Sequence, residues 1–447
     1  MTLNETVPAC DVLRPGDEGY DLSARTFFTE GRPAEVWRPR TAADVAEAVA
    51  YAARHGLAVS VRSGGHSALG FSTNDGGLVV DLQHLGSVEV LDLERRLVRV
   101  GGGATWGGVA AALDPLGWGL TSGDTAGVGV GGLTLGGGIG WMVRRDGLAI
   151  DNLVGALVVT ADGRLLTASA DEHPDLFWAL RGGGGNFGVV VDLDFVARPV
   201  PTVRFGSVGY ELDDPARFVG RWRDAMRAAP DELSSTLVLA PRTPEVPPTA
   251  SVLLCWAGDP ECAGTAPEDA IEPLLELGTV TTWNVAERRY AEVLEDAVLP
   301  PGLRLVARNV LVPALDDAVV AAVDQVHRAT PGAAVAIRAL GGAFGRVPAD
   351  ATAFAHRDAE AMVLLGLVRP AATPDAEVEQ ALRPWAAVAT PGTGTYLNFQ
   401  GSATEADLAA AYPPATYARL AAVKRAYDPD NRFARNHNIA PEPLTRP

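Results

Sequence analysis

The spacing of apolar residues changes several times before residue 200. In residues 41–55 apolar positions recur every third or fourth residue, with Thr41 suited to cap the start and Gly56 the end. This predicts a helix. Short runs rich in Val and Leu predict strands, at residues 57–61, 77–82, 87–91, 97–100, 155–160, 165–169 and 189–195. Further helices are predicted at residues 106–113 and 171–180. Strands mixed with helices in this way are typical of α+β or α/β architecture.

After Pro199 the pattern changes, and we place a domain boundary near Pro201. Predicted strands cover residues 203–211, 235–239, 250–256, 280–286, 303–312, 333–340 and 362–368. Predicted helices cover residues 215–228, 267–277 and 318–329. This order favours an antiparallel sheet that carries its helices on one side. In the tail we predict a strand at residues 396–399 and a helix that starts at Tyr417 and ends near Tyr427.

Charge and cysteine content exclude several classes of function. The 447 residues carry a formal net charge of −18, which argues against nucleic acid or an anionic membrane as a partner. Cys10, Cys255 and Cys262 do not have the spacing of a disulfide framework, and the histidines do not have that of a metal site. Residues 1–20 lack the pattern of a signal peptide, and the uncharged run 125–143 is too rich in glycine for a membrane helix. We therefore expect a soluble, cytoplasmic protein that binds no metal.

The first candidate site is the loop after the predicted strand 57–61, with the sequence Arg62-Ser63-Gly64-Gly65-His66-Ser67. Paired glycines after a strand let the backbone turn sharply and bring its N–H groups close to a bound group, usually a phosphate. His66 places an imidazole beside that group. Taken alone, the loop is a weak signal, because a lone histidine in a loop is more often an ordinary residue.

A second candidate site is the glycine-rich segment 123–140. Gly127, Gly129 and Gly132 match the G-x-G-x-x-G pattern of dinucleotide-binding folds, which requires a strand before it and a helix after it. Residues 117–122 make a poor strand and more glycines follow Gly132, so we do not favour a nicotinamide site of that type. A purely structural loop is the alternative, but so many glycines cost backbone entropy and commonly mark a close approach to a ligand.

These segments occur in an order that resembles the flavin-binding half of the berberine bridge enzyme-like oxidases, within the vanillyl-alcohol oxidase superfamily. The resemblance rests on residues 33–82, on the glycine-rich segment and the stretch that follows it up to Phe195, and on the tail from Tyr396 to Pro441. It implies an α+β fold with a two-part FAD-binding domain, residues 1–200 and 396–447. An antiparallel-sheet substrate domain, residues 201–395, is inserted between the two parts.

The resemblance also implies which residues hold the FAD. His66 stands at the position that carries FAD covalently through its 8α-methyl group. Some members add a second bond from a cysteine, but Thr125 stands there and cannot form a thioether, so we predict a link through His66 only. The remaining implied cofactor-binding residues are Arg62, Ser63, Gly64, Gly65, Ser67, Gly123, Asp124, Gly127, Val128, Gly131, Gly132, Gly136, Gly137, Gly138, Gly140, Val189, Val190, Tyr396 and Asn398.

Two positions bear on the reaction that the resemblance implies. Val128 stands at the oxygen-gating position and resembles the oxygen-reactive members, which favours an oxidase that reduces O2 to H2O2. Family oxidases of alcohols and sugars usually end in Tyr-x-Asn-Tyr, whose second tyrosine removes the substrate proton, but Phe399 stands there and has no proton to exchange. Tyr396 and Tyr290 are therefore the candidate catalytic residues, with Tyr210 as a further tyrosine to consider.

The leading hypothesis is a covalent FAD-linked oxidase that takes hydride from a small organic molecule: an alcohol, a sugar or a natural-product intermediate. Phe399 motivates an alternative, a flavoprotein of the same fold that catalyses an oxidative cyclisation or a non-redox rearrangement in secondary metabolism. A third hypothesis is a flavin-free binding protein that kept the fold.

Other charged residues and histidines receive a structural interpretation. Arg144, Arg145 and Asp151 occur close together after the glycine-rich segment, and we expect a surface ion cluster. His356 lies in the predicted substrate domain, where we expect a packed or surface histidine.

Overall fold

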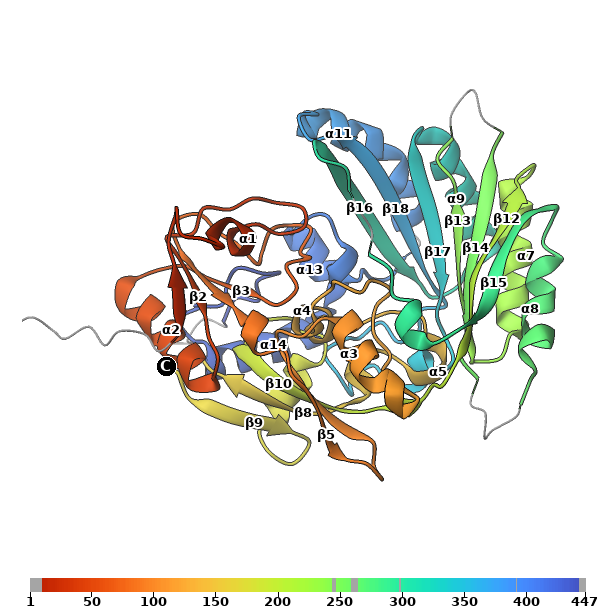
Figure 1. Cartoon of the computed structure of the whole chain (residues 1–447). Helices are drawn as coiled ribbons and strands as arrows, with labels where there is room; N and C mark the ends of the chain where they lie inside the picture. Colours follow the sequence, from red (N-terminus) through yellow and green to blue (C-terminus); the bar gives the residue numbers. More distant parts are fainter. Residues whose placement is uncertain (1–9, 243–246, 259–263, 297–298, 391, 442–447) are drawn as a thin grey trace, which may run out of the picture.

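The computed structural model describes residues 10–242, 247–258, 264–296, 299–390 and 392–441. Its first part contains a four-stranded sheet in the order β1 (Asp11–Leu13), β2 (Glu35–Arg38), β4 (Leu78–Asp81) and β3 (Val59–Arg62), of which β2, β4 and β3 are parallel (Figure 1). Helix α2 (Ala42–His55) connects β2 to β3. The predicted helix 41–55 is confirmed: Thr41 and Asp44 form a capping box, and Gly56 ends the helix with φ 65°.

The seven-stranded sheet lies wholly within the predicted insert 201–395. Its order is β15 (Val280–Arg288), β12 (Val203–Glu211), β14 (Thr249–Trp256), β13 (Leu233–Leu239), β17 (Ala333–Ala339), β18 (Ala361–Pro370) and β16 (Leu303–Val312), and every pair is antiparallel. One face packs against α7 (Pro215–Ala228), α8 (Pro267–Leu275), α9 (Asp317–Ala329), α11 (Asp375–Leu382) and α12 (Ala386–Ala389). Figure 1 shows α7 and α8 on the outer side of this sheet. The predicted α+β class, with helices on one side of an antiparallel sheet, is confirmed. We call the other side the open face.

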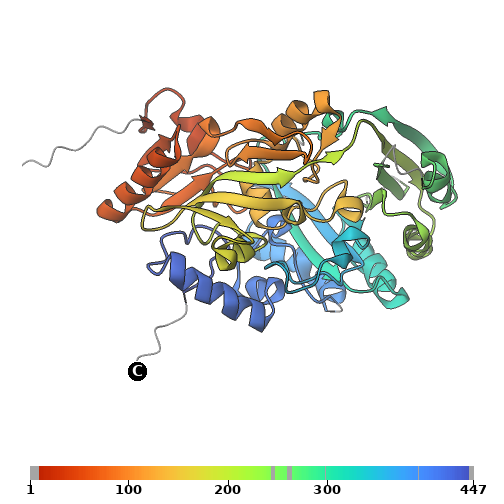
Figure 2. The same cartoon turned by 90° about the horizontal axis from the view of Figure 1, so that it is seen from below.

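The tail returns to the first part of the chain. Helices α13 (Glu405–Ala411) and α14 (Pro414–Tyr427) are the last helices of the described residues. Figure 2 shows the blue C-terminal helix along that first part, where α14 contacts α6 (Pro174–Leu180). The predicted strand 396–399 is wrong, because Leu397–Phe399 forms a 3-10 turn. Asn309 of β16 explains the difference: its side chain donates to Tyr396 O at 2.9 Å and accepts from Tyr396 N at 2.8 Å. A side chain thus takes the backbone groups that a neighbouring strand would need.

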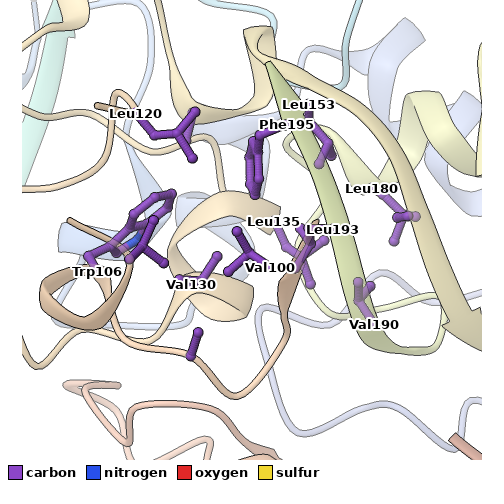
Figure 3. Packing of buried hydrophobic residues seen from close by; sticks show 14 of the residues in the cluster. Val100, Trp106, Leu120, Val130, Leu135, Leu153, Leu180, Val190, Leu193 and Phe195 are labelled. Carbon is purple, nitrogen blue, oxygen red and sulfur yellow. The ribbon is translucent and has the colours of Figure 1, made fainter. Parts of the chain in front are cut away.

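The glycine-rich segment packs against a five-stranded antiparallel sheet and shares its hydrophobic core. Its order is β5 (Val88–Asp92), β6 (Leu97–Gly101), β10 (Val189–Val196), β8 (Leu153–Val159) and β9 (Leu165–Ser169). Figure 3 shows Val100 and Leu193 of this sheet gathered with Trp106 of α3 (Trp106–Leu113) and with Val130 and Leu135 of α4 (Val130–Leu135). The short elements of the chain are α1 (Tyr20–Ala24), β7 (Trp118–Gly119), α5 (Val143–Asp146), β11 (Arg198–Pro199) and α10 (Ala343–Arg346).

The expected surface ion cluster is wrong, since all three of its members lie in the interior. Arg144 is 7 % exposed and donates to Leu340 O at 2.9 Å. The Arg145 and Asp146 side chains form an ion pair at 2.6 Å and are 11 % and 8 % exposed. Asp151 receives two hydrogen bonds from the Arg357 guanidinium, at 2.7 and 2.8 Å. Arg144 and Asp151 thus tie the segment after the glycines to the insert, at Leu340 and Arg357.

Other expectations concern cysteines and membranes. Cys10 and Cys255 are buried free thiols, and Cys262 lies outside the described residues. Among the helices that the structure describes, none is long and apolar enough to cross a membrane. Within the same residues, no cluster of His, Cys, Asp and Glu could hold a metal ion.

Candidate active site

The two candidate loops meet backbone to backbone. A Cβ placed on Gly64 would lie 2.3 Å from Gly129 N, and one placed on Gly129 would lie 2.1 Å from Gly64 N. No side chain fits at either position, which explains why both are glycine. Gly65 has φ 72°, a left-handed conformation that turns the loop. The structure thus brings together two segments that the sequence singles out separately.

The glycine-rich segment is not a loop throughout, since it contains the short helix α4. Its start is held by Trp106 N, which donates to Val128 O at 3.0 Å, and by Val130 N, which donates to Ala104 O at 2.9 Å. A Cβ on Gly132 would meet nothing within 4 Å. The segment therefore packs tightly at Gly129 and is exposed one turn later at Gly132.

His66 lies at the contact between these loops. Its ring stacks on Phe27 with the centroids 4.9 Å apart and an interplanar angle of 17°. A Cβ on Gly127 would lie 2.9 Å from His66 Nε2 and 3.0 Å from Asp296 Oδ1, and that carboxylate accepts from Gly127 N at 2.6 Å. Burial lowers the pKa of His66 more than the Asp296 charge raises it. The imidazole is therefore neutral at neutral pH, and one ring nitrogen keeps a free lone pair.

A hollow of ≈ 640 Å³ opens beside the loop and is lined in part by Arg62, Ser63, Gly64, Asp81 and Gly103. Ser63 Oγ donates to Gly102 O at 2.6 Å, which ties the loop to the end of β6. Arg62 donates to Arg25 O at 2.5 Å and faces Asp81 at 3.6 Å. Ser67 Oγ accepts from Phe71 N at 3.2 Å and closes the turn.

Tyr396 lies where the tail, the glycine-rich segment and the open face meet. Its oxygen accepts from Gly138 N at 3.1 Å, from Ile139 N at 3.4 Å and from Asn398 Nδ2 at 2.9 Å. Burial raises the pKa of Tyr396, and these three donors oppose the rise without cancelling it. A hydroxyl oxygen has two lone pairs, so three N–H donors suit a developing phenolate better than a neutral hydroxyl.

Sequence reasoning missed Arg338, whose guanidinium joins the sheet to the glycine-rich segment. It lies on β17 and donates to Asp124 Oδ2 at 2.6 Å, to Thr236 Oγ1 at 3.2 Å and to Ile139 O at 3.3 Å. Its Cζ is 5.6 Å from the centre of the Trp141 ring and 5.8 Å from that of Phe399. A single arginine within an apolar strand, residues 333–340, is the only sequence signal that could have marked it.

Comparisons with known proteins show which family has this sequence and fold. Residues 33–169 match the family model described as FAD binding domain, and residues 395–440 match the one described as Berberine and berberine like. The (R)-6-hydroxynicotine oxidase of Paenarthrobacter nicotinovorans is 34 % identical, over 97 % of this chain and 97 % of its own. The chain belongs to the berberine bridge enzyme-like family of FAD-linked oxidoreductases.

Solved structures of the berberine bridge enzyme-like family share the fold. The 6-hydroxy-D-nicotine oxidase of Arthrobacter nicotinovorans superposes with a TM-score of 0.87 at 32 % identity, covering 98 % of this chain and 100 % of that one. A glucooligosaccharide oxidase from Acremonium strictum, at 24 % identity, superposes with a TM-score of 0.83 over 97 % of each chain. That glucooligosaccharide oxidase carries a 6-S-cysteinyl, 8α-N1-histidyl FAD.

The other two tyrosines considered for catalysis lie in different surroundings from Tyr396. Tyr290 is buried in the core, its hydroxyl lies 3.1 Å from Ser122 Oγ, and burial raises its pKa. Tyr210 packs on the helical side of the sheet and donates to Leu274 O, which separates it from the open face. Tyr210 therefore points away from the open face, and a catalytic role of Tyr290 stays a prediction.

Val189 and Val190 are predicted to contact the cofactor through their backbone rather than their side chains. Val189 and Val190 are buried on β10, and a Cβ on Gly102 would meet Val190 O at 2.2 Å. Their contact with the cofactor stays a prediction. His356 is buried with Nε2 2.8 Å from Ala410 O, so the expectation of a packed histidine is confirmed.

Backbone positions also lie beside Asn398 and within the glycine-rich segment. Asn398 donates to Leu133 O at 3.0 Å, and a Cβ on Gly136 would lie 2.3 Å from Asn398 Oδ1. The remaining predicted glycines of the segment, whose roles stay predictions, also face close neighbours: Gly123, Gly131, Gly137, Gly138 and Gly140.

Proposed function

We propose that this protein is an oxidase with FAD held covalently through His66 only, which removes hydride from a small organic molecule and passes the electrons to O2, giving H2O2. The bound FAD supplies the hydride acceptor and the reaction with O2. The observation that carries the proposal is the backbone contact of the His66 loop with Gly129, in a chain 34 % identical to an FAD-linked oxidase over 97 % of its length.

The residues present fit FAD. The two loops approach each other at glycines that admit no side chain, while the space beyond Gly132 and the hollow beside Gly64 admit a bound group. Backbone N–H groups of a glycine turn suit a pyrophosphate. We therefore keep the predicted cofactor-binding residues of both loops as the site of the FAD.

The covalent link needs a neutral nitrogen nucleophile, and the lowered pKa of His66 provides one at neutral pH. Thr125 instead donates its hydroxyl proton to Asp124 Oδ1 at 3.0 Å and carries no sulfur. This supports a single attachment.

Removal of hydride from an alcohol or amine also releases a proton, which needs an acceptor. Tyr396 is the proton acceptor we propose, because Gly138 N, Ile139 N and Asn398 stabilise negative charge on its oxygen. Phe399 packs edge-on against the Tyr396 ring at 5.2 Å and excludes water from that side.

The first experiment compares His66→Ala with the control His55→Ala, which removes an exposed histidine from the end of α2. We expect the wild type and the control to be yellow, to keep the colour in an acid-precipitated pellet, and to show the mass of one added FAD. His66→Ala should lose the added mass. Colour released to the supernatant by the wild type would overturn the covalent link, and a colourless wild type would overturn the proposal.

The alternative, an oxidative cyclisation or non-redox rearrangement in secondary metabolism, rests on Phe399. Anaerobic reduction with dithionite followed by exposure to air separates the hypotheses without a known substrate. Rapid reoxidation with H2O2 release supports the oxidase, and Val128→Leu should slow it by narrowing the oxygen path. A flavin that stays reduced in air would contradict an oxidase. The cytoplasmic location and the place in secondary metabolism remain predictions.

A further inference from the structure

In the middle of the open face, the strand neighbours of Arg338 are neutral. A single register row crosses five central strands through Ser207, Leu253, Thr236, Arg338 and Met362. Residues paired directly across an antiparallel sheet share a face. Arg338 thus has Thr236 on one side and Met362 on the other.

The neighbouring row is uncharged. It runs through Ser251, Val238, Ala336 and Leu364, all partly exposed. Partial exposure in the middle of a sheet, opposite the face that the helices cover, indicates space above these side chains. That space is walled by small and apolar groups.

Part of the hydrogen-bonding capacity of the Arg338 guanidinium is unused. A guanidinium has five N–H groups, and three hydrogen bonds to Asp124, Thr236 and Ile139 leave two N–H groups without a partner among the residues that the structure describes. The side chain is 10 % exposed, and that of Asp124 is 28 % exposed, so the pair reaches the space over the sheet. Because Asp124 cancels the charge of Arg338, the pair offers N–H donors without a net charge.

We propose that Arg338 selects the substrate: its free N–H groups hold an oxygen of an uncharged, largely apolar molecule, of the phenol or ketone class, over the central strands. The proposal deepens the proposed function, on which it rests for the reaction. An anion would meet the Asp124 carboxylate, a cation would meet Arg338, and a sugar would leave most of its hydroxyls against apolar side chains.

The test uses three aromatic probes that differ in charge: 4-methylphenol, benzoate and benzylammonium. Binding to the purified holoprotein at pH 7 is followed by tryptophan fluorescence and by the visible spectrum. We expect 4-methylphenol to bind about tenfold more tightly than either ion. Tighter binding of either ion by the wild type would overturn the proposal.

Variants separate Arg338 from general packing. Arg338→Met should weaken 4-methylphenol binding about tenfold. The affinity of Arg338→Lys should fall between that of Arg338→Met and that of the wild type, because lysine keeps the positive charge but lacks the planar set of guanidinium N–H donors. The control Arg308→Met removes a sheet arginine on the opposite face that pairs with Glu379 at 2.8 Å, and should bind like the wild type. Unchanged binding in Arg338→Met would overturn the proposal.

Asp124→Asn changes the charge and not the shape. The pair then carries a net positive charge, so the preference should move toward benzoate by about tenfold. An unmoved preference would contradict the role of the pair. Flavin content is measured in every sample: a colourless protein with the expected preference would remove the proposed function alone, and a yellow protein without it would remove this inference alone.

Discussion

Two ion pairs fasten distant parts of this chain: one lies in the tail, and one lies at the seam, where the glycine-rich segment meets the open face. In the tail, Lys424 Nζ donates to Asp428 Oδ2 at 2.6 Å, to Asn186 O at 2.8 Å and to Phe433 O at 3.1 Å. Both side chains are 0 % exposed. All three donors of the ammonium are used.

The Asp428 carboxylate of the tail pair is likewise surrounded by hydrogen-bond donors. It also accepts from Arg432 N at 2.8 Å and from Phe433 N at 2.9 Å. The seam pair, Arg338 and Asp124, keeps unused N–H groups and partial exposure. The comparison teaches that the balance of donors and acceptors, rather than burial alone, separates a pair that holds the fold from one that is available to a ligand.

The sharpest way to break this comparison is Lys424→Met, which removes the single lysine of the chain. It leaves the Asp428 carboxylate buried without its cation, and we expect a loss of about 3–5 kcal/mol in the free energy of unfolding. The control Arg54→Met breaks an exposed pair with Glu47, 56 % and 47 % exposed, and should cost less than about 1 kcal/mol. Thermal melting and urea unfolding check both; equal losses in the two variants would refute the distinction.

Tyr396→Phe tests the other side of this balance, because three N–H groups donate to the Tyr396 oxygen, more than a neutral hydroxyl needs. Removal of the oxygen should slow anaerobic flavin reduction by substrate about 10²–10⁴-fold. Because burial raises the pKa of Tyr396, the wild-type rate should climb as the pH rises toward that pKa, and the variant should lose this climb. A stopped-flow pH profile measures both. A variant with the wild-type rate and profile would return Tyr396 to a packing role.

Local elements were predictable because their causes are local. The capping box of Thr41 and Asp44, with Gly56 behind it, defines helix α2 from a few adjacent residues. The tail strand failed because Asn309, far away in the sequence, bonds the backbone of Tyr396. Arg338 was missed for the same reason: strand register places Thr236 beside it, and the fold brings Asp124 and Ile139 from a distant segment.

The candidate site shows the same limit. The motif around His66 identifies the loop, but the contact of Gly64 with Gly129 exists only in the folded chain. The sequence alone favours a surface ion cluster for Arg144 and Asp151, since charges grouped in a short stretch are usually solvated. The structure buries them against carbonyl groups and Arg357. Sequence patterns therefore singled out the two candidate loops and Tyr396, and missed Arg338.

The smallest expected effect concerns acid and the seam pair. Burial raises the pKa of Asp124, but the charge and hydrogen bond of Arg338, together with the hydrogen bonds from Thr125 and the backbone, lower it more, so it lies below its ordinary value of 3.8. A carboxyl with a depressed folded-state pKa adds stability above its unfolded pKa and loses it as the pH falls through the folded pKa. Asp124→Asn should therefore be less stable than the wild type at pH 7, by about 1 kcal/mol because the pair is partly exposed. The gap should narrow below about pH 4. Urea midpoints at pH 7 and pH 3 measure it. If the gap stays constant, the Asp124 carboxylate does not owe its charge to Arg338, and the seam pair would lose the neutrality on which substrate selection depends.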